Sequence, residues 1–136
     1  MKLDRNLAFF DLETTGVTVG ADRIIEISVI RISPDGTRAD FHKRVNPEIP
    51  IPEFVSQLTG ITNADVANAP DFAAIASELK QFMDGCDLAG YNSNRFDVPF
   101  LVEEFHRVGV DFSLTGRRLV DVQNIFHKME PRTLAA

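Results

Sequence analysis

Two carboxylates stand two residues apart near the N-terminus. Asp11 and Glu13 lie in residues 6–13 (N-L-A-F-F-D-L-E), a short apolar run that predicts a buried strand. Side chains two apart on a strand share a face, where two like charges repel and are costly to bury unpaired. A divalent cation such as Mg²⁺ or Mn²⁺ would offset that cost, because both ions prefer carboxylate oxygens. The simpler alternative is that Asp11 ends the strand and caps the following Thr-Thr-Gly turn.

A second acidic segment lies further along the chain. Residues 90–101 read G-Y-N-S-N-R-F-D-V-P-F-L, and residues 9–16 read F-F-D-L-E-T-T-G. In this order and spacing they resemble the first two motifs of the DEDD-type (DnaQ-like) 3′–5′ exonucleases, the family of the proofreading epsilon subunit of DNA polymerase III. Residues 55–62 (V-S-Q-L-T-G-I-T) resemble the substrate-contacting stretch between those motifs. The resemblance spans residues 7–129, most of the chain.

The resemblance implies a site for two divalent cations, Mg²⁺ or Mn²⁺, held by three catalytic carboxylates. By position, Asp11 would bridge both ions, Glu13 would bind one, and Asp97 would hold the pair from the opposite side. Two such cations can activate a water and stabilise the leaving oxygen of an in-line displacement at phosphorus. Asp97 near a helix start would also gain from the helix dipole, and its alternative role is that of an N-cap only.

The resemblance also implies contacts with the terminal nucleotide. The residues that it places around the acids are Leu12, Thr14, Thr15, Leu58, Thr59, Asn92 and Phe96. Each has a structural alternative. Thr14, Thr15 and Asn92 would satisfy a turn, whereas Leu12, Leu58 and Phe96 would belong to the core. For Leu58 and Phe96 the two interpretations are equally favoured.

Hydrophobic periodicity indicates the elements that must position these residues. Strands are expected over 6–13, 23–32, 38–46, 87–91 and 117–121, and helices over 53–59, 71–84, 97–108 and 121–129. This order predicts an α/β fold with a mixed sheet, antiparallel first and parallel later. With the resemblance, it becomes a ribonuclease H-like five-stranded sheet flanked by helices, with the C-terminal helix missing.

Turn and cap residues mark several boundaries. Residues 34–36 (Pro-Asp-Gly) predict the turn of a hairpin, and Gly60 predicts the end of the first helix. Asp71 is expected as the N-cap of the helix over 71–84, and Asp121 as the cap of the last one.

The family's last motif, H-x-x-x-x-D or its tyrosine variant, supplies a general base and a fourth carboxylate, and it is not found in the sequence. His106 and Asp111 have the matching spacing, but His106 lies nine residues from Asp97, about 13 Å along one helix at 1.5 Å per residue. His42 and His127 have no acidic partners at ligand spacing and are expected to be structural or exposed.

Length and composition favour a single domain. The chain has 136 residues, 44% hydrophobic and 25% charged, which is typical of a globular protein. No apolar stretch approaches the ~18 residues of a membrane span, there is no secretory signal, and the lone Cys86 excludes an internal disulfide. A cytoplasmic setting is the default. We expect one exonuclease-like domain over 1–136, incomplete at its C-terminus, impaired in activity, and prone to self-associate through the face left by the missing helix.

The net charge of −6 argues against a basic groove for nucleic acid. Setting aside the three clustered acids of the 20 leaves 17 against 14 Lys and Arg, and two divalent ions would add four positive charges locally. Bound metal ions would then supply most of the affinity for phosphate, and this affinity would depend only weakly on salt concentration. The expected partners are a nucleic acid with a free 3′ end and, through the family, a DNA polymerase subunit.

Three functions are compatible with these features. The first is a metal-dependent 3′–5′ exonuclease that releases mononucleotides from single-stranded DNA or RNA. The second is an inactive or weakly active nucleic-acid-binding remnant of the same fold. The third is another ribonuclease H-like nuclease, such as an endonuclease that cuts RNA–DNA hybrids.

Overall fold

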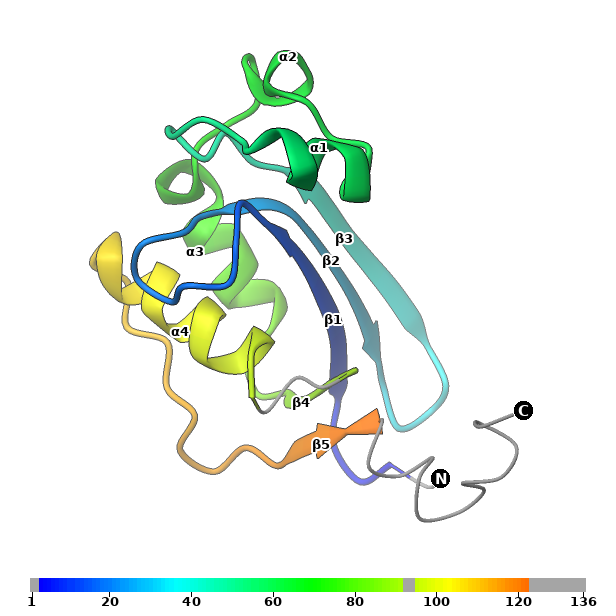
Figure 1. Ribbon diagram of the computed structural model, residues 1–136. Coiled ribbons are helices and arrows are strands. Elements are labelled where there is room, and N and C mark those ends of the chain that lie inside the picture. The colour runs from blue at the N-terminus through cyan, green and yellow to red at the C-terminus, as the bar shows by residue number, and fades with distance from the viewer. Residues whose placement is uncertain (1–2, 92–94, 123–136) are drawn as a thin grey trace.

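A computed structural model describes residues 3–91 and 95–122 of the chain. Its strands form one mixed sheet in the order β3-β2-β1-β4-β5 (Figure 1). The strands are β1 (Leu7–Thr14), β2 (Ile24–Ile32), β3 (Arg38–Arg44), β4 (Asp87–Gly90) and β5 (Leu119–Asp121). The helices are α1 (Glu53–Thr59), α2 (Asn63–Val66), α3 (Phe72–Phe82) and α4 (Asp97–Arg107). The β1–β2 and β2–β3 pairs are antiparallel, and the β1–β4 and β4–β5 pairs are parallel, which confirms the predicted fold class.

One face of the sheet is covered by α3 and α4 (Figure 1). The two helices contact each other through Phe72 and Phe105, whose ring centroids are 5.2 Å apart, and both contribute to the main core. Ala8, Phe10 and Leu12 of β1 point into this core. Because side chains alternate along a strand, the acids of β1 therefore point to the opposite face.

A smaller cluster lies where α1 and α2 approach β2. Its buried members are Ile25, Ile51, Val55, Ile61 and Val66. The helix α2 was absent from the sequence prediction, although its start carries a capping box: Thr62 Oγ1 accepts from Asp65 N, and Asp65 Oδ2 accepts from Thr62 N. The T-x-x-D spacing was the signal that could have revealed it.

Two cap predictions are confirmed and two alternatives are wrong. Asp71 Oδ1 accepts from Ala74 N at 2.9 Å, and Gly60 ends α1 with a left-handed φ of 78°. Asp97 is not an N-cap, because it is the first residue of α4 and the cap position belongs to Phe96. Asp11 does not end its strand either, since β1 continues to Thr14.

The last strand is shorter than expected. The last strand begins at Leu119 rather than at residue 117, and Asp121 is its final residue. Val122 is helical, so the cap role of Asp121 stays a prediction. The rest of the helix expected over 121–129 lies outside the described residues. In the described ranges, no helix is both long and apolar enough to cross a membrane.

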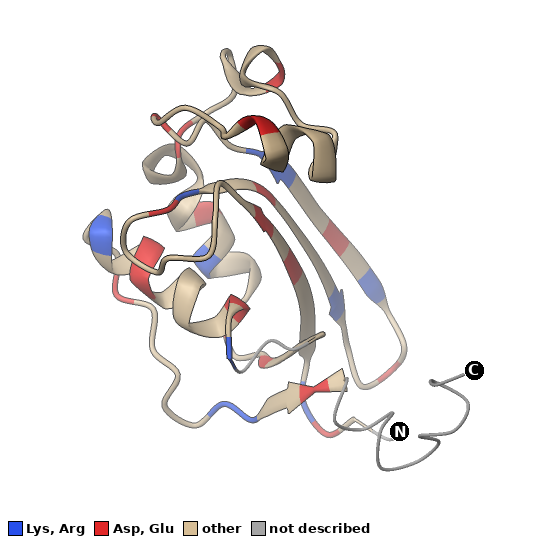
Figure 2. Ribbon diagram, viewed as in Figure 1, with Lys and Arg blue, Asp and Glu red and all other residues tan. Residues whose placement is uncertain are grey.

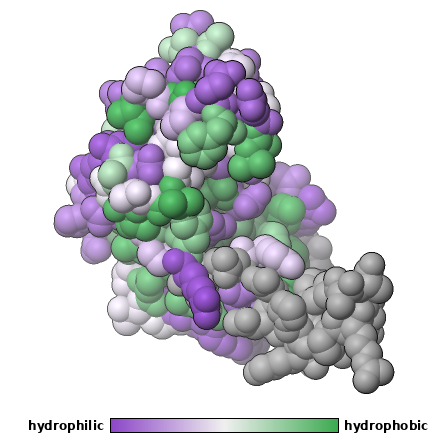
Figure 3. Space-filling view, in the orientation of Figure 1, coloured by the Kyte–Doolittle hydropathy of each residue, from purple (hydrophilic) through white to green (hydrophobic). Residues whose placement is uncertain are grey.

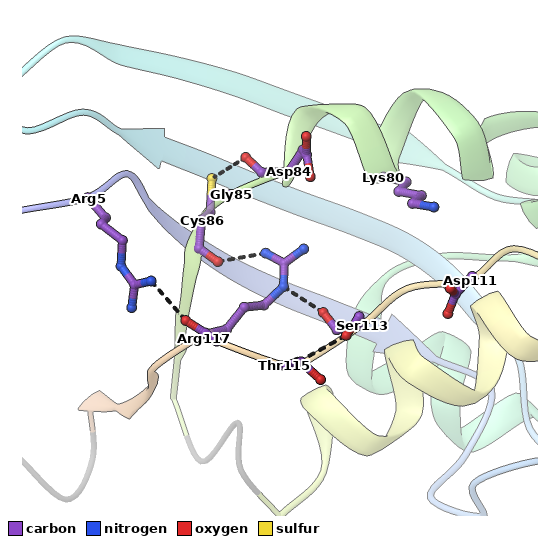
Figure 4. Close-up of a pocket in the computed structure, with 10 residues that line it drawn as sticks. Arg5, Lys80, Asp84, Gly85, Cys86, Asp111, Ser113, Thr115 and Arg117 are labelled. Atoms are coloured by element: carbon purple, nitrogen blue, oxygen red, sulfur yellow. Dashed lines mark hydrogen bonds between the residues drawn. The ribbon is translucent and has the colours of Figure 1, made fainter.

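Near the amino end of β4, the side chain of Arg117 forms hydrogen bonds with three backbone carbonyl groups (Figure 4). Its Nη1 donates to the backbone oxygens of Met83 (2.7 Å) and Cys86 (2.6 Å), and its Nε donates to the Ser113 oxygen at 2.8 Å. Met83 is the C-cap of α3, so Arg117 satisfies a carbonyl that the helix leaves without a partner. A pocket of about 420 Å³ opens beside these groups, and the guanidinium of Arg117 is already used by the backbone.

Asp87 at the start of β4 is also surrounded by cationic groups. It is only 7% exposed, and its Oδ1 accepts from Arg118 N at 2.8 Å. The carboxylate pairs with Arg5 Nη2 at 2.7 Å and with Arg118 Nε at 3.4 Å. These contacts join the N-terminal segment, β4 and the start of β5 into one unit.

Candidate active site

Three carboxylates gather between β1 and the amino end of α4. Asp11 and Glu13 share the face of β1 that points away from the main core, and Asp97 is the first residue of α4. Figure 2 shows the acidic segments of β1 and of the start of α4 at the same level of the molecule. The charges of Asp11 and Glu13 contribute to the raised pKa of Asp97, so β1 and the helix after β4 bring these acids within electrostatic reach of one another.

Burial and neighbouring negative charge raise the pKa of all three acids. Burial raises the pKa of Asp97 to about 7, and the charges of Asp11 and Glu13 add to this effect. The Asp97 residue is 6% exposed. Burial also raises the pKa of Asp11 and of Glu13, and the negative charge of Glu26 contributes to both. The site therefore holds excess negative charge that is expensive to maintain.

This donor set fits a hard divalent cation. Within residues 3–91 and 95–122, none of the three acids forms an ion pair, and the causes that shift their pKa values include no positive charge. Oxygen ligands from two separate elements are what Mg²⁺ and Mn²⁺ prefer. In the same ranges, however, no three His, Cys, Asp or Glu side chains lie close enough together to hold a metal ion. The three acids influence one another electrostatically, but their side chains are farther apart than the ligands of a single metal ion would be.

Glu26 is a fourth acid at this site that the sequence prediction missed. It lies directly opposite Glu13 in the β1–β2 pairing. On its other side, Glu26 Oε2 contacts His42 Nε2 at 3.2 Å and Arg44 Nε at 3.3 Å. His42 is exposed, as expected, and its acidic partner comes from the neighbouring strand rather than from its own stretch of sequence. The signal lay in the register of the predicted hairpin, which places Glu26 and Arg44 opposite each other.

A groove of about 230 Å³ lies beside Glu13. It brings together five of the seven residues expected to contact substrate: Leu12, Thr14, Leu58, Thr59 and Phe96. Two further apolar residues, Val17 and Phe54, line it and were missed because neither belongs to a recognised motif. Figure 3 shows hydrophobic side chains exposed over α1, which forms one wall.

The apolar residues of the groove divide between core and surface. Leu58 is 83% exposed, so the alternative that it belongs to the core is wrong. Leu12 is a member of the main core and still borders the groove. Phe96 combines both positions, because it packs on Phe100 with ring centroids 5.2 Å apart while lining the groove.

The hydroxyl groups of the three threonines form hydrogen bonds with groups close to them in the chain. Thr15 is 1% exposed; its hydroxyl donates to Asp22 Oδ1 at 2.9 Å and accepts from Arg23 N at 3.0 Å, which matches the alternative that it satisfies a turn. Thr14 Oγ1 donates to the Gly16 oxygen at 2.6 Å. Thr59 Oγ1 donates to the Val55 oxygen at 2.8 Å. Asn92 lies outside the described residues.

His106 does not approach the acids. His106 lies near the carboxyl end of α4 and contributes with Asp111 to a different pocket, as the helix distance predicted. Its Nδ1 is 3.9 Å from Glu103 Oε1, a neighbour on the same helix. His127 lies outside the described residues.

A mixed five-stranded sheet with acids on its central strand and on the helix after β4 defines the class of ribonuclease H-like exonuclease folds. A family profile described as Exonuclease, RNase_T, matches residues 8–128. The chain belongs to this exonuclease family.

The curated relatives include DNA polymerase III chains and an exonuclease. A DNA polymerase III subunit epsilon from Treponema pallidum is 40% identical over 95 residues, which are 70% of this chain and 44% of that protein. A 3′-5′ exonuclease DinG from Bacillus subtilis is 39% identical over 112 residues, covering 82% of this chain and 12% of the relative. A PolC-type DNA polymerase III from Caldanaerobacter subterraneus is 35% identical over 108 residues, covering 79% and 8%. The chain thus spans less than half the length of each.

Solved structures of exonuclease I share the fold. The E. coli enzyme in complex with a dT13 oligonucleotide superimposes with a TM-score of 0.80 at 20% identity, over 95% of this chain and 31% of that one. Exonuclease I from Methylocaldum szegediense gives a TM-score of 0.81 at 20% identity, over 94% and 30%. At this identity the likeness concerns the fold.

Proposed function

We propose that the chain is a metal-dependent 3′–5′ exonuclease that hydrolyses the terminal phosphodiester of single-stranded DNA or RNA and releases nucleoside monophosphates. One observation carries the proposal. Asp11 and Glu13 of β1 lie within electrostatic reach of Asp97 of α4 with no neighbouring cation in the described residues, and together with burial their charges raise the pKa of Asp97 to about 7. Such a site is stabilised by added positive charge, and two divalent cations supply it.

Each carboxylate has a distinct role in the proposal. Asp11, in the interior of β1, would hold both ions, Glu13 would hold one of them, and Asp97 would hold them from the α4 side. Bound divalent cations would activate a water and stabilise the leaving oxygen at phosphorus. The protein contributes the fixed positions of the oxygens, because β1 is a central strand of the sheet and α4 is packed on the core.

The groove beside Glu13 is the proposed site of the terminal nucleotide. Its exposed apolar side chains, above all Leu58, offer a surface on which an unpaired base can pack. The name of the Bacillus subtilis relative, 3′-5′ exonuclease DinG, supports the direction of cleavage. The epsilon relative from Treponema pallidum supports association with a polymerase.

End-labelled single strands test the proposal directly. Wild-type protein is incubated with 3′-labelled and 5′-labelled oligonucleotides, with Mn²⁺, with Mg²⁺ or with a chelator. We expect labelled mononucleotide from the 3′ label only, a descending ladder from the 5′ label, and no products with the chelator. Asp11→Ala removes activity, whereas Asp40→Ala, which deletes an exposed acid of β3, retains it.

The other candidate functions are outcomes of the same assay. Internal cuts in an RNA–DNA hybrid would identify a different ribonuclease H-like nuclease. Strand binding without cleavage at any metal concentration would identify a binding module. Full activity of Asp11→Ala would reject the proposed site itself.

A further inference from the structure

Glu104 is a buried acid that the proposed chemistry does not use. It is 3% exposed and lies in α4, the helix that begins with Asp97. Its Oε1 accepts from the backbone N of Ile24 at 3.1 Å, across 80 residues of sequence. Its Oε2 pairs with Arg107 Nε at 2.8 Å. Glu104 therefore joins the helix of one proposed metal ligand to the start of β2.

The contact falls at an irregularity in the sheet. The β1–β2 register shifts between Glu13 and Thr14, and Thr14 then pairs with Ile24. A β-bulge interrupts the ladder and redirects neighbouring side chains. Glu104 accepts from an amide at this irregularity, one residue pair beyond Glu13.

The spacing along α4 places both acids on one side of the helix. Asp97 and Glu104 are seven residues apart, which is close to two helical turns and about 10 Å along the axis. Residues at this spacing share a face. The helix thus presents Asp97 toward Asp11 and Glu13 at one end of this face, and is anchored to β2 two turns later.

We infer that Glu104 is a positioning residue: its contact with the Ile24 amide sets the placement of Asp97 relative to Glu13 across the β1–β2 irregularity. This inference rests on the proposed function, because it treats both acids as metal ligands. Glu104 does not touch the reacting atoms. It acts by fixing the two elements that carry the ligands, and small misplacements of such groups reduce turnover strongly.

Three variants separate positioning from simple stability. Glu104→Gln keeps an oxygen that can accept from Ile24 N but loses the charge that pairs with Arg107. Glu104→Leu has a similar size and cannot accept. Glu104→Asp keeps the charge but is one methylene shorter, and it serves where the leucine variant does not fold.

Asp87→Leu is the matched control. Asp87 is equally buried, also accepts from a backbone amide and also pairs with arginine, but it lies at the amino end of β4. For every variant we measure kcat and KM on a single strand, the rise in Tm on adding Mn²⁺, and hydrogen exchange at the Ile24 amide. The last two do not require turnover.

We expect Glu104→Leu and Glu104→Asp to lower kcat by about 10²-fold at similar KM. They should also shrink the Mn²⁺-induced rise in Tm and expose the Ile24 amide to exchange. Glu104→Gln should keep kcat, the Mn²⁺-induced rise in Tm and the protection of the Ile24 amide at wild-type values. Asp87→Leu should lower Tm while leaving kcat of the folded protein unchanged. Wild-type kcat and Mn²⁺ response in folded Glu104→Leu or Glu104→Asp, or failure of Glu104→Gln to restore them, would overturn the inference.

Failure of the proposed function gives a different pattern. If wild-type protein responds to Mn²⁺ but cleaves nothing, the proposed function falls and the Tm comparison still decides the role of Glu104. If wild-type protein neither responds to Mn²⁺ nor cleaves, both fall.

Discussion

Two aspartates of nearly equal burial lie in opposite surroundings. Asp87, 7% exposed, meets Arg5, the side chain of Arg118 and a backbone amide at the amino end of β4. Asp97, 6% exposed, meets the negative charges of Asp11 and Glu13 at the start of α4. Burial alone therefore says little about a carboxylate; the sign of the charges around it distinguishes a structural joint from a site that requires a ligand.

The largest difference is expected in activity. Asp97→Asn should lower kcat by about 10³-fold or more, because one ligand of a cooperating set is lost. Its Tm without metal should be equal to or above that of wild type, since a repelled charge is removed. Single-turnover cleavage and thermal denaturation in chelator measure the two effects. A variant that loses stability and keeps its rate would place Asp97 with Asp87 as a structural residue.

Asp87 should show the reverse. Asp87→Ala leaves Arg5 and the Arg118 amide without their partner, and the free energy of unfolding should fall by about 2 kcal/mol. The rate of the folded protein should stay at the wild-type value, because Asp87 lies at the other end of β4 from the acids. Urea denaturation measures the stability. A loss of cleavage without a loss of stability would contradict the assignment of Asp87 as a structural residue.

The pH dependence of stability sharpens the contrast. In metal-free protein, folded Asp97 keeps its proton up to a pKa of about 7, whereas its ordinary pKa is 3.8. The unfolded chain thus releases this proton first, and stability falls as pH rises from about 4 to about 7. Tm in chelator should be several degrees higher at pH 5 than at pH 8, and Asp97→Asn should reduce that difference. An unchanged difference in the variant would assign the effect to other groups.

The smallest effect concerns the outer partner of Asp87. Arg5→Gln removes a solvent-exposed arginine, so the free energy of unfolding should fall by at most about 1 kcal/mol. Added salt should weaken the wild-type contact by a similar amount. A loss as large as that of Asp87→Ala would mean that Arg5, rather than the Arg118 amide, carries most of the stabilisation.

The fold was largely predictable because its elements are strongly patterned. The short apolar run of β1, the partly alternating and β-branched β2, and the apolar face of α3 each indicate one type of element. The helix α2 was missed because four residues are too few to show a period, so only its cap could have indicated it. Asp97 was placed near the helix start correctly, but the assignment of the cap position to Phe96 instead depends on backbone angles that the sequence does not reveal.

Candidate site residues could be predicted where they belong to a recognised motif. They could not be predicted where strand pairing or a long-range contact brings them to the site. Asp11 and Glu13 were predicted from residue type and spacing, and Asp97 and Leu58 from the resemblance of their segments to family motifs. Glu26 and Glu104 became visible only through contacts made across strands or over 80 residues. Thr15 shows the opposite limitation. Its place beside the acids in the sequence suggested a contact with substrate, whereas its hydroxyl forms hydrogen bonds within the loop, to Asp22 and Arg23.

The outer strand β3 has a consequence for behaviour at high protein concentration. It lies at the edge of the sheet, and within the described residues no strand pairs with its outer side. Exposed Arg38, Asp40, His42, Lys43 and Arg44 follow one another along it with few apolar neighbours. An incoming strand would have to bury these charges, which is how natural sheets avoid aggregation through their edges. His42 and Arg44, which contact Glu26, therefore also oppose the pairing of β3 with an incoming strand.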